Sequence, residues 1–389
     1  MRDFVFTSPT KIYFGKGVEN NVGQVLIEAG YKTCLLVYGS GSIVKSGLYD
    51  RIKEKLDKVN LKVFEISGVV ANPLIGKVRE GVKVCKENNV DVILAIGGGS
   101  VIDTAKAISV GAKVDFDPYL FNLGEKTPKE KIDVVTILTI SAAGSELSNS
   151  CVISDTTRNL KRGFNSDLIR PVISFLNPEL TYSVSKYQTA CGVVDILMHT
   201  LERFIVLDDA ELTSNIAVGL MKTVISNGLI CYNDPTNYEA RSNIMLASSL
   251  SHNGLTSLGI KFFFTVHKLE HELSGFYPSV AHGAGLAILW HAWARYVVDK
   301  HPQKFAKFGY DVLGFIPTNN VLEDALHSID FLESYFKQLG MPTRLSELEI
   351  NNIDIVSMSL SVTLNKTKKV LGIVDLDYDD VVNIYKLAL

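Results

Sequence analysis

Three of the eight histidines of this 389-residue chain, His267, His271 and His282, fall within one short stretch. His267 and His271 are four residues apart, so a helix would place both imidazoles on one face. His282 follows a Gly and Pro break and precedes Gly283-Ala284-Gly285, small residues that allow a close backbone approach. Imidazole is the commonest side-chain metal ligand and the usual acid or base near neutral pH. A polar helix and loop explain each histidine singly, and a metal site needs a further ligand elsewhere.

A carboxylate and an imidazole repeat the four-residue spacing in residues 192–202, GVVDILMHTLE. Asp195 and His199 would converge on one face of a largely apolar helix. The pair suits a divalent metal such as Fe²⁺ or Zn²⁺, although a buried Asp–His hydrogen bond in a core helix explains it equally well. With His267 and His282 it gives one carboxylate and three imidazoles, a set that leaves room for a substrate oxygen.

Residues 97–103, GGGSVID, follow the apolar run VILAI and open a segment of helical pattern. Gly97, Gly98 and Gly99 let backbone N–H groups approach a phosphate, and the start of a helix favours an anion. Ser100 can cap that helix or donate to a phosphate oxygen, and Asp103 lies one turn further in. We interpret the stretch as a nucleotide phosphate site rather than a tight turn without a ligand, although it lacks the spacing GxGxxG.

Small hydroxyl residues follow another strand-like run in residues 139–148, TISAAGSELS. Thr139, Ser141 and Ser148 could line the floor of a cofactor cleft, but loops of small polar residues are common. This loop therefore supports a cofactor site only together with the glycines at 97–99.

Composition describes an ordinary globular chain, with 47% hydrophobic and 21% charged residues. The net charge of −3 gives no electrostatic reason to expect nucleic acid or an anionic membrane as partner. The five cysteines are scattered and free of CxxC spacing, which indicates reduced thiols rather than a thiolate metal cluster. No signal-peptide pattern appears and no apolar run reaches the roughly 18 residues that span a bilayer, so we expect a cytoplasmic protein.

The order of predicted elements divides the chain near residue 180. Up to that point short apolar runs alternate with amphipathic helical segments, the pattern of βαβ units around a parallel, Rossmann-like sheet. We therefore expect a dinucleotide-binding α/β domain at residues 1–180 and an all-helical metal-binding domain at residues 181–389. Predicted strands cover residues 33–38, 61–66, 90–96, 134–139 and 172–176, with a strand-like alternation in 1–15, and predicted helices cover 48–59, 74–88, 100–111, 187–206, 212–231, 239–251 and 323–339.

Over nearly the whole chain, these motifs resemble the iron-containing (group III) alcohol dehydrogenases. The resemblance rests on GGGSVIDTAK at 97–106, NPELT at 177–181, GVVDILMHTLE at 192–202, and HKLEHELSGFY with AHGAGLAI across 267–288. The last two phrases are most similar to the butanol dehydrogenase branch. The family implies a dehydroquinate synthase-like fold, with a dinucleotide-binding α/β domain and a helical metal domain. It also implies reversible NAD(P)-dependent oxidation of alcohols to aldehydes.

The resemblance further implies roles for single residues. Carried over motif by motif, Asp195, His199, His267 and His282 would bind the metal, Fe²⁺ or Zn²⁺. His271 would be a catalytic residue close to the nicotinamide. We expect it to orient the substrate or relay the alcohol proton, because imidazole titrates in the right range.

The loop after the first long strand bears on which nicotinamide cofactor is preferred. It reads Tyr38-Gly39-Ser40-Gly41-Ser42 and offers no carboxylate to the adenosine ribose. In family members that favour NAD, an Asp looks to occupy the position of Gly39. Gly39, Ser40 and Ser42 would instead supply N–H and hydroxyl donors to a 2′-phosphate, so we predict a preference for NADP(H).

Two other classes of function stay open. A dehydroquinate synthase-like or glycerol dehydrogenase-like enzyme would share the fold, the nucleotide and the metal. A non-catalytic nucleotide-binding protein would use the histidines for a structural ion only. We expect a small alcohol or aldehyde such as butanol or butanal as substrate, neither nucleic acid nor membrane as partner, and a homodimer.

Overall fold

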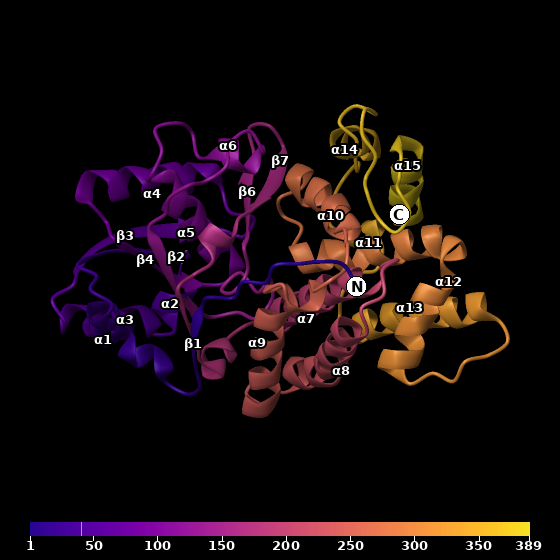
Figure 1. Cartoon of the computed structure of the whole chain (residues 1–389), viewed down its shortest axis with the longest axis horizontal. Coiled ribbons are helices and arrows are strands. Elements are labelled where there is room, and N and C mark those ends of the chain that lie inside the picture. The colour runs from indigo at the N-terminus through magenta and orange to yellow at the C-terminus, as the bar shows by residue number, and fades with distance from the viewer. Residues whose placement is uncertain (40) are drawn as a thin grey trace. The chain divides into compact units, whose positions relative to one another are not determined.

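The computed structural model describes residues 1–39 and 41–389, which divide into two compact units (Figure 1). The α/β unit comprises Thr7–Val184 and Pro235–Ser249. The helical unit comprises Met1–Phe6, Ser185–Asp234 and Leu250–Leu389. The sequence pattern places one boundary at residue 180, whereas the folded chain also assigns Met1–Phe6 to the helical unit and Pro235–Ser249 to the α/β unit.

Six parallel strands form the centre of the α/β unit, in the order β1-β8-β5-β4-β2-β3. A parallel sheet is covered on both faces, which explains the unbroken apolar runs in its central strands. The expected fold class, a parallel α/β sheet followed by a mostly helical region, is confirmed. The strands are β1 Lys11–Phe14, β2 Thr33–Gly39, β3 Lys62–Val69, β4 Val92–Gly97, β5 Asp133–Leu138 and β8 Ile173–Leu176.

Side chains of the central strands alternate between two apolar layers, one on each face of the sheet. In β2, Leu35 and Val37 join the layer that α4 and α5 complete, whereas Cys34 and Leu36 join the layer that α1 and α3 complete. Figure 1 shows α4 on one side of the strands and α1 with α3 on the other. The helices of this unit include α1 Val22–Glu28, α2 Ser42–Lys45, α3 Leu48–Asp57, α4 Ile75–Asn88, α5 Gly99–Gly111 and α6 Tyr119–Asn122.

Two features of the α/β unit differ from the predicted elements. An antiparallel hairpin, β6 Ser150–Asp155 with β7 Leu160–Asn165, is absent from the prediction. The β7 sequence LKRGFN carries two cations and a glycine, so its apolar content is too low to mark a strand. The strand-like alternation in residues 1–15 is also only partly realised, because the strand is confined to Lys11–Phe14.

α11 (His282–Val297) is the central helix of the helical unit and packs against α7, α10, α13 and α15. Two glycines on α11 allow these close contacts. A Cβ on Gly283 would lie 2.2 Å from the Cys191 carbonyl oxygen of α7. The other helices include α7 Lys186–Phe204, α8 Glu211–Asn233, α10 Thr265–Phe276, α12 Pro302–Phe308, α13 Val321–Gln338, α14 Ile355–Val362 and α15 Tyr378–Leu387. Most of α9, Tyr238–His252, belongs to the α/β unit, and only its last residues belong to the helical unit.

α8 is the one described helix that is long and apolar enough to cross a membrane, judged by length and composition alone. Its buried residues recur every three or four positions, as at Ala217, Leu220, Met221 and Val224. α8 also packs against α7, where a Cβ on Gly228 would lie 2.8 Å from Val193. This periodicity is typical of a helix that packs on one face.

We predict that Gly283→Ala destabilises the chain. The added methyl group would clash with the Cys191 carbonyl, which lies 2.2 Å from the ideal Cβ position, and overpacking of this kind costs about 1–3 kcal/mol. Urea unfolding followed by circular dichroism measures the change. Gly219→Ala is the matched control: it lies in a helix with no atom within 4 Å of its Cβ position, so it should stabilise by about 0.5–1 kcal/mol. Equal stability of both variants would contradict the close approach of α11 to α7.

Candidate metal centre

The predicted metal ligands lie on three helices of the helical unit. Asp195 and His199 are on α7, His267 is on α10 and His282 is on α11. Asp195 Oδ1 lies 3.5 Å from His199 Nδ1, 3.6 Å from His267 Nε2 and 3.8 Å from His282 Nε2. The first three residues are buried, but the His282 side chain is 25% exposed. The set is therefore open on the side of His282.

The chemistry and spacing of these atoms fit a divalent cation. Asp195 Oδ1, His199 Nδ1 and His267 Nε2 are buried and have no hydrogen-bond partner among the described residues. Leaving such an atom unpaired costs about 1–3 kcal/mol, and more when it is charged. Ligands about 2.1 Å from a tetrahedral ion lie about 3.4 Å apart, close to the measured 3.5–3.8 Å.

Two buried glutamates hold the outer nitrogens of two histidines. Glu202 Oε2 contacts His267 Nδ1, and Glu270 Oε2 contacts His282 Nδ1. Glu202 Oε1 also accepts a hydrogen bond of 2.7 Å from the Val266 amide. A carboxylate on Nδ1 would fix the tautomer that leaves the Nε2 lone pair available to a bound ion, an arrangement common behind metal-bound histidines.

These carboxylates also control the protonation of the site. Burial opposes a charge on His267, but Glu202 and Asp195 outweigh burial and raise the pKa of His267 to about 9. Burial lowers the pKa of His199 well below its usual value, and the neighbouring His252 and His267 lower it further. The carboxylates therefore favour the protonated form of His267, whereas burial favours the neutral form of His199.

His199 is held between two other imidazoles. Its ring stacks on His267 with centroids 4.6 Å apart and planes inclined by 16°. On α9, His252 approaches it with a centroid distance of 4.0 Å. Asp195, His267 and His282 form a group whose ligand atoms lie within 4.8 Å of one another. His199 joins this group through Asp195.

His271 lies one helical turn beyond His267 on α10. Its ring centroid is 5.6 Å from that of His282. Its ring nitrogen also lies within 4.8 Å of the ligand atoms of Glu270 and His282. His271 is therefore beside the open side of the centre, where a small substrate could reach it.

The structure corrects one expectation about His282. The sequence places it in a loop after the Gly and Pro break, but His282 is the first residue of α11. Gly285, one turn further along, makes room for the supporting carboxylate, because its Cβ would lie 2.8 Å from Glu270 Cγ. The two glycines that follow His282 therefore bring α11 close to α7 and α10.

Sequence reasoning missed Glu202, Glu270 and His252. Both glutamates carry a detectable signal: Glu202 is three residues after His199, and Glu270 is three residues after His267. At that spacing a helix places each glutamate on the face that carries a predicted ligand, but the spacing does not predict the contacts of Glu202 with His267 and of Glu270 with His282. His252 carries no such signal, since its neighbour His199 lies far away in the sequence.

In the α/β unit, the predicted cofactor segments follow adjacent strands. Gly39 ends β2, Gly97 ends β4, and Thr139 follows β5. β2 pairs with β4 and β4 pairs with β5, and the Thr139 amide donates to the Gly97 carbonyl at 3.1 Å. These segments therefore meet at the carboxyl edge of one parallel sheet, where such folds bind ligands.

The glycine turn has a packing role as well as the predicted binding role. A Cβ on Gly97 would lie 2.5 Å from Val101, and one on Gly98 would lie 2.1 Å from Ile140. α5 begins at Gly99, so Ser100 lies inside the first turn and does not cap the helix. The capping expectation for Ser100 is wrong, and the predicted phosphate contact of Gly97, Gly98, Gly99 and Ser100 stays a prediction.

The other predicted cofactor residues differ in their surroundings. Asp103 accepts hydrogen bonds from Ser145 Oγ at 2.5 Å and from the Val152 amide at 2.9 Å. Ser148 is buried and its Oγ accepts from Lys106 Nζ at 3.2 Å. Both side chains are thus committed to internal contacts. Ser141 is also largely buried, Ser42 is the first residue of α2, and Ser40 lies outside the described residues.

Comparison with known proteins agrees with this architecture. The family described as iron-containing alcohol dehydrogenase matches residues 9–178, and the C-terminal domain of the Fe-containing alcohol dehydrogenase family matches residues 189–389. The NADH-dependent butanol dehydrogenase A of Clostridium acetobutylicum is 38% identical over 388 residues, which are 99% of each chain. The NADPH-dependent aldehyde reductase YqhD of Escherichia coli is 32% identical over 362 residues, which are 92% of each chain.

A solved structure extends the likeness to the whole fold. The crystal structure of NADH-dependent butanol dehydrogenase A from Thermotoga maritima matches with a TM-score of 0.95 and 34% identity, covering 100% of this chain and 99% of that one. On these matches and the fold described above, the chain belongs to the iron-containing alcohol dehydrogenase family and is an oxidoreductase of the alcohol dehydrogenase class.

Proposed function

We propose that the protein interconverts small primary alcohols and aldehydes, such as butanol and butanal, with NADP(H) and a divalent metal. The observation that carries this proposal is the set of ligand atoms around Asp195, open on the side where His271 lies. The names of the relatives support the substrate class, since two are butanol dehydrogenases and one is an aldehyde reductase.

Asp195, His199, His267 and His282 would hold the ion, Fe²⁺ or Zn²⁺. A bound divalent ion would act as a Lewis acid toward the substrate oxygen, and the nicotinamide would carry the hydride. Glu202 and Glu270 keep the Nδ1 atoms of two histidines engaged, so that their Nε2 atoms face Asp195. His271, whose ring centroid lies 5.6 Å from that of His282, would pass a proton between the substrate oxygen and solvent.

The proposed NADP(H) preference rests on the loop after β2. Gly39 ends the strand, and neither it nor Ser42 offers a carboxylate to the adenosine ribose. The nearest acidic side chain on the neighbouring strand is Glu65, which is engaged by Lys53 at 3.1 Å and by Tyr49 at 2.9 Å. The relatives include both NADH-dependent and NADPH-dependent enzymes, so the proposal depends on this loop.

The homodimer is proposed from the edge strand β1. It pairs on one side with β8, while Ile12 and Phe14 are 38% and 40% exposed. Exposed apolar residues on a sheet edge favour pairing with a second chain. Size-exclusion chromatography with light scattering decides between a dimer and a monomer.

We predict that the purified, metal-loaded protein oxidises NADPH when butanal is added, and that a chelator removes this activity.

His271→Ala should lower kcat by about 10²–10⁴-fold and abolish the pH dependence that this imidazole contributes. Steady-state assays across pH 6–9 measure both effects. No NADPH or NADH consumption by the metal-loaded protein would contradict the function, and an unchanged pH profile would contradict only the role of His271.

We predict that metal binding releases a proton near pH 7.5. The pKa of His267 is raised to about 9, so at neutral pH the ion must displace its proton, and affinity should rise about tenfold per pH unit until that pKa is passed. Calorimetric titration of the apoprotein with Zn²⁺ in two buffers of different ionisation enthalpy counts the protons. Glu202→Gln, which removes the carboxylate on Nδ1, should release fewer protons and bind about 10–100-fold more weakly. Identical proton release from both proteins would rule out the Glu202–His267 coupling.

We predict that Gly39→Asp shifts cofactor preference toward NAD(H). The side chain fits, since the ideal Cβ meets only the Val69 carbonyl oxygen at 3.4 Å. A carboxylate there repels a 2′-phosphate and should lower kcat/KM for NADPH at least about tenfold, with little effect on NADH. The NADH value of the same variant is the internal control. An unchanged NADPH-to-NADH ratio would mean that this loop does not contact the 2′ position.

A further inference from the structure

The loop between β5 and β6, residues 139–149, is buried in its middle although it has no regular structure. Residues 144–148 are all buried. A buried loop cannot rely on water for its main-chain carbonyl groups, so each needs a donor from the protein. Side chains supply them: Ser174 Oγ donates to the Glu146 carbonyl at 2.9 Å, and Ser248 Oγ donates to the Ala142 carbonyl at 3.1 Å.

A buried lysine on α5 donates further hydrogen bonds to the end of the loop and to the first residue of β6. Lys106 on α5 has no exposed surface. Its Nζ donates to the Ser148 carbonyl at 2.9 Å, to Ser148 Oγ at 3.2 Å and to the Ser150 carbonyl at 2.9 Å. These contacts use all the protons of an ammonium group. Burial lowers the pKa of Lys106 to about 8, against the opposing effect of Asp103 one turn earlier.

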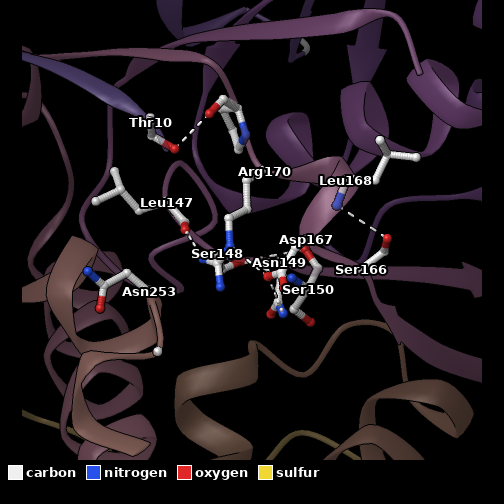
Figure 2. Close-up of polar contacts among 12 residues, drawn as sticks. Thr10, Leu147, Ser148, Asn149, Ser150, Ser166, Asp167, Leu168, Arg170 and Asn253 are labelled. Atoms are coloured by element: carbon white, nitrogen blue, oxygen red, sulfur yellow. Dashed lines mark hydrogen bonds and ion pairs between the residues drawn. The ribbon is translucent and has the colours of Figure 1, made fainter. Parts of the chain in front are cut away.

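A buried arginine holds the same loop from a different element. Arg170 precedes β8 and is 5% exposed. Its Nη1 donates to the Leu147 carbonyl at 2.6 Å, and its Nε donates to Asp167 Oδ1 at 2.9 Å. Asn149 Nδ2 donates to the same Asp167 oxygen at 3.1 Å. Figure 2 shows Arg170 between Leu147 and Asp167, with Asn149 beside them.

Lys106 also links this loop to the glycine turn. α5 begins at Gly99, directly after the turn, and carries Asp103 and Lys106 on successive turns. Asp103 accepts from Ser145 Oγ and the Val152 amide, at 2.5 and 2.9 Å, while Lys106 holds residues 148 and 150. α5 therefore contacts both the glycine turn, which it directly follows, and the loop after β5.

We infer that Lys106 and Arg170 are positioning residues for the nicotinamide cofactor. These two buried cations hold residues 147–150 in a fixed position relative to the glycine turn. This inference rests on the proposed function, because the contacts of the turn and the loop with the cofactor are themselves proposed. The alternative is that the two cations only stabilise the α/β unit. If the two cations position the cofactor, a folded variant that lacks one of them binds the cofactor more weakly. If they only stabilise the α/β unit, a folded variant binds it as wild type does.

The test is Lys106→Met, which keeps an unbranched side chain one heavy atom shorter and removes its donors. Titration with NADPH and with NADH, followed by the fluorescence of the reduced nicotinamide, gives Kd without turnover. We expect Kd for the preferred cofactor to rise about tenfold or more, since three hydrogen bonds from a charged group are lost, while kcat at saturating cofactor stays within about threefold. Circular dichroism and metal content show that the variant is folded and loaded.

Ser109→Ala is the matched control. Ser109 is buried on the same helix and donates to the Ile132 carbonyl at 2.5 Å, away from the loop. It should lower stability without changing Kd. If both variants weaken binding equally, the effect is general loss of stability and the inference is wrong.

Arg170→Lys keeps the test informative if Lys106→Met does not fold. It retains the charge but loses the fork that reaches Leu147 and Asp167 together, so Kd should rise about threefold to tenfold. Wild-type protein that binds cofactor, together with folded variants of unchanged Kd, would overturn this inference alone. Wild-type protein that binds neither NADPH nor NADH would overturn the proposed function and this inference with it.

Discussion

Contact between a buried carboxylate and the Nδ1 atom of a histidine is the interaction on which the helical unit depends. It occurs twice, between Glu202 and His267 and between Glu270 and His282. With Asp195, these residues place three carboxylates in the interior, where each would be costly without positive charge nearby. A divalent cation bound by Asp195 and the ring nitrogens that face it would supply that charge. The supporting glutamates and the ligands therefore form one electrostatic unit.

Helix packing makes this unit possible. α11 approaches α7 closely because Gly283 has no Cβ, and it approaches α10 because Gly285 leaves room for Glu270. The α/β unit differs, because its predicted cofactor segments are mostly loops. There, adjacent parallel strands bring the loop ends to one edge, and buried side chains such as Lys106 and Arg170 satisfy the carbonyl groups of the loop after β5. In both units, buried charged side chains hold the predicted site residues in place.

The sequence predicts those parts of the site that depend on local spacing. Asp195 and His199 are one turn apart, and the glycines at 97–99 follow a recognisable strand, so helical and strand periodicity place them without further information. Parallel strands gave equally clear runs of apolar residues, which is why the order of the α/β elements could be predicted.

Long-range contacts account for what the sequence does not predict. Glu202 meets His267 across 65 residues, and Lys106 reaches Ser148 across 42 residues, so neither contact leaves a periodic signal. The β6–β7 hairpin is missed because β7 is polar. The assignment of Pro235–Ser249 to the α/β unit depends on packing rather than composition. The proposed cofactor preference rests on a single loop, and the relatives of this chain include enzymes of both preferences.

Metal content tests the central claim most directly. Elemental analysis of purified wild-type protein should find about one Fe²⁺ or Zn²⁺ ion per chain. Asp195→Ala should retain less than about a tenth of that amount while keeping its helical circular dichroism, because Asp195 faces all three histidines. His327→Ala, which removes a histidine stacked on Phe315 away from the centre, should keep the full metal content. Equal metal content in wild type and Asp195→Ala would contradict the assignment of the ion to this centre.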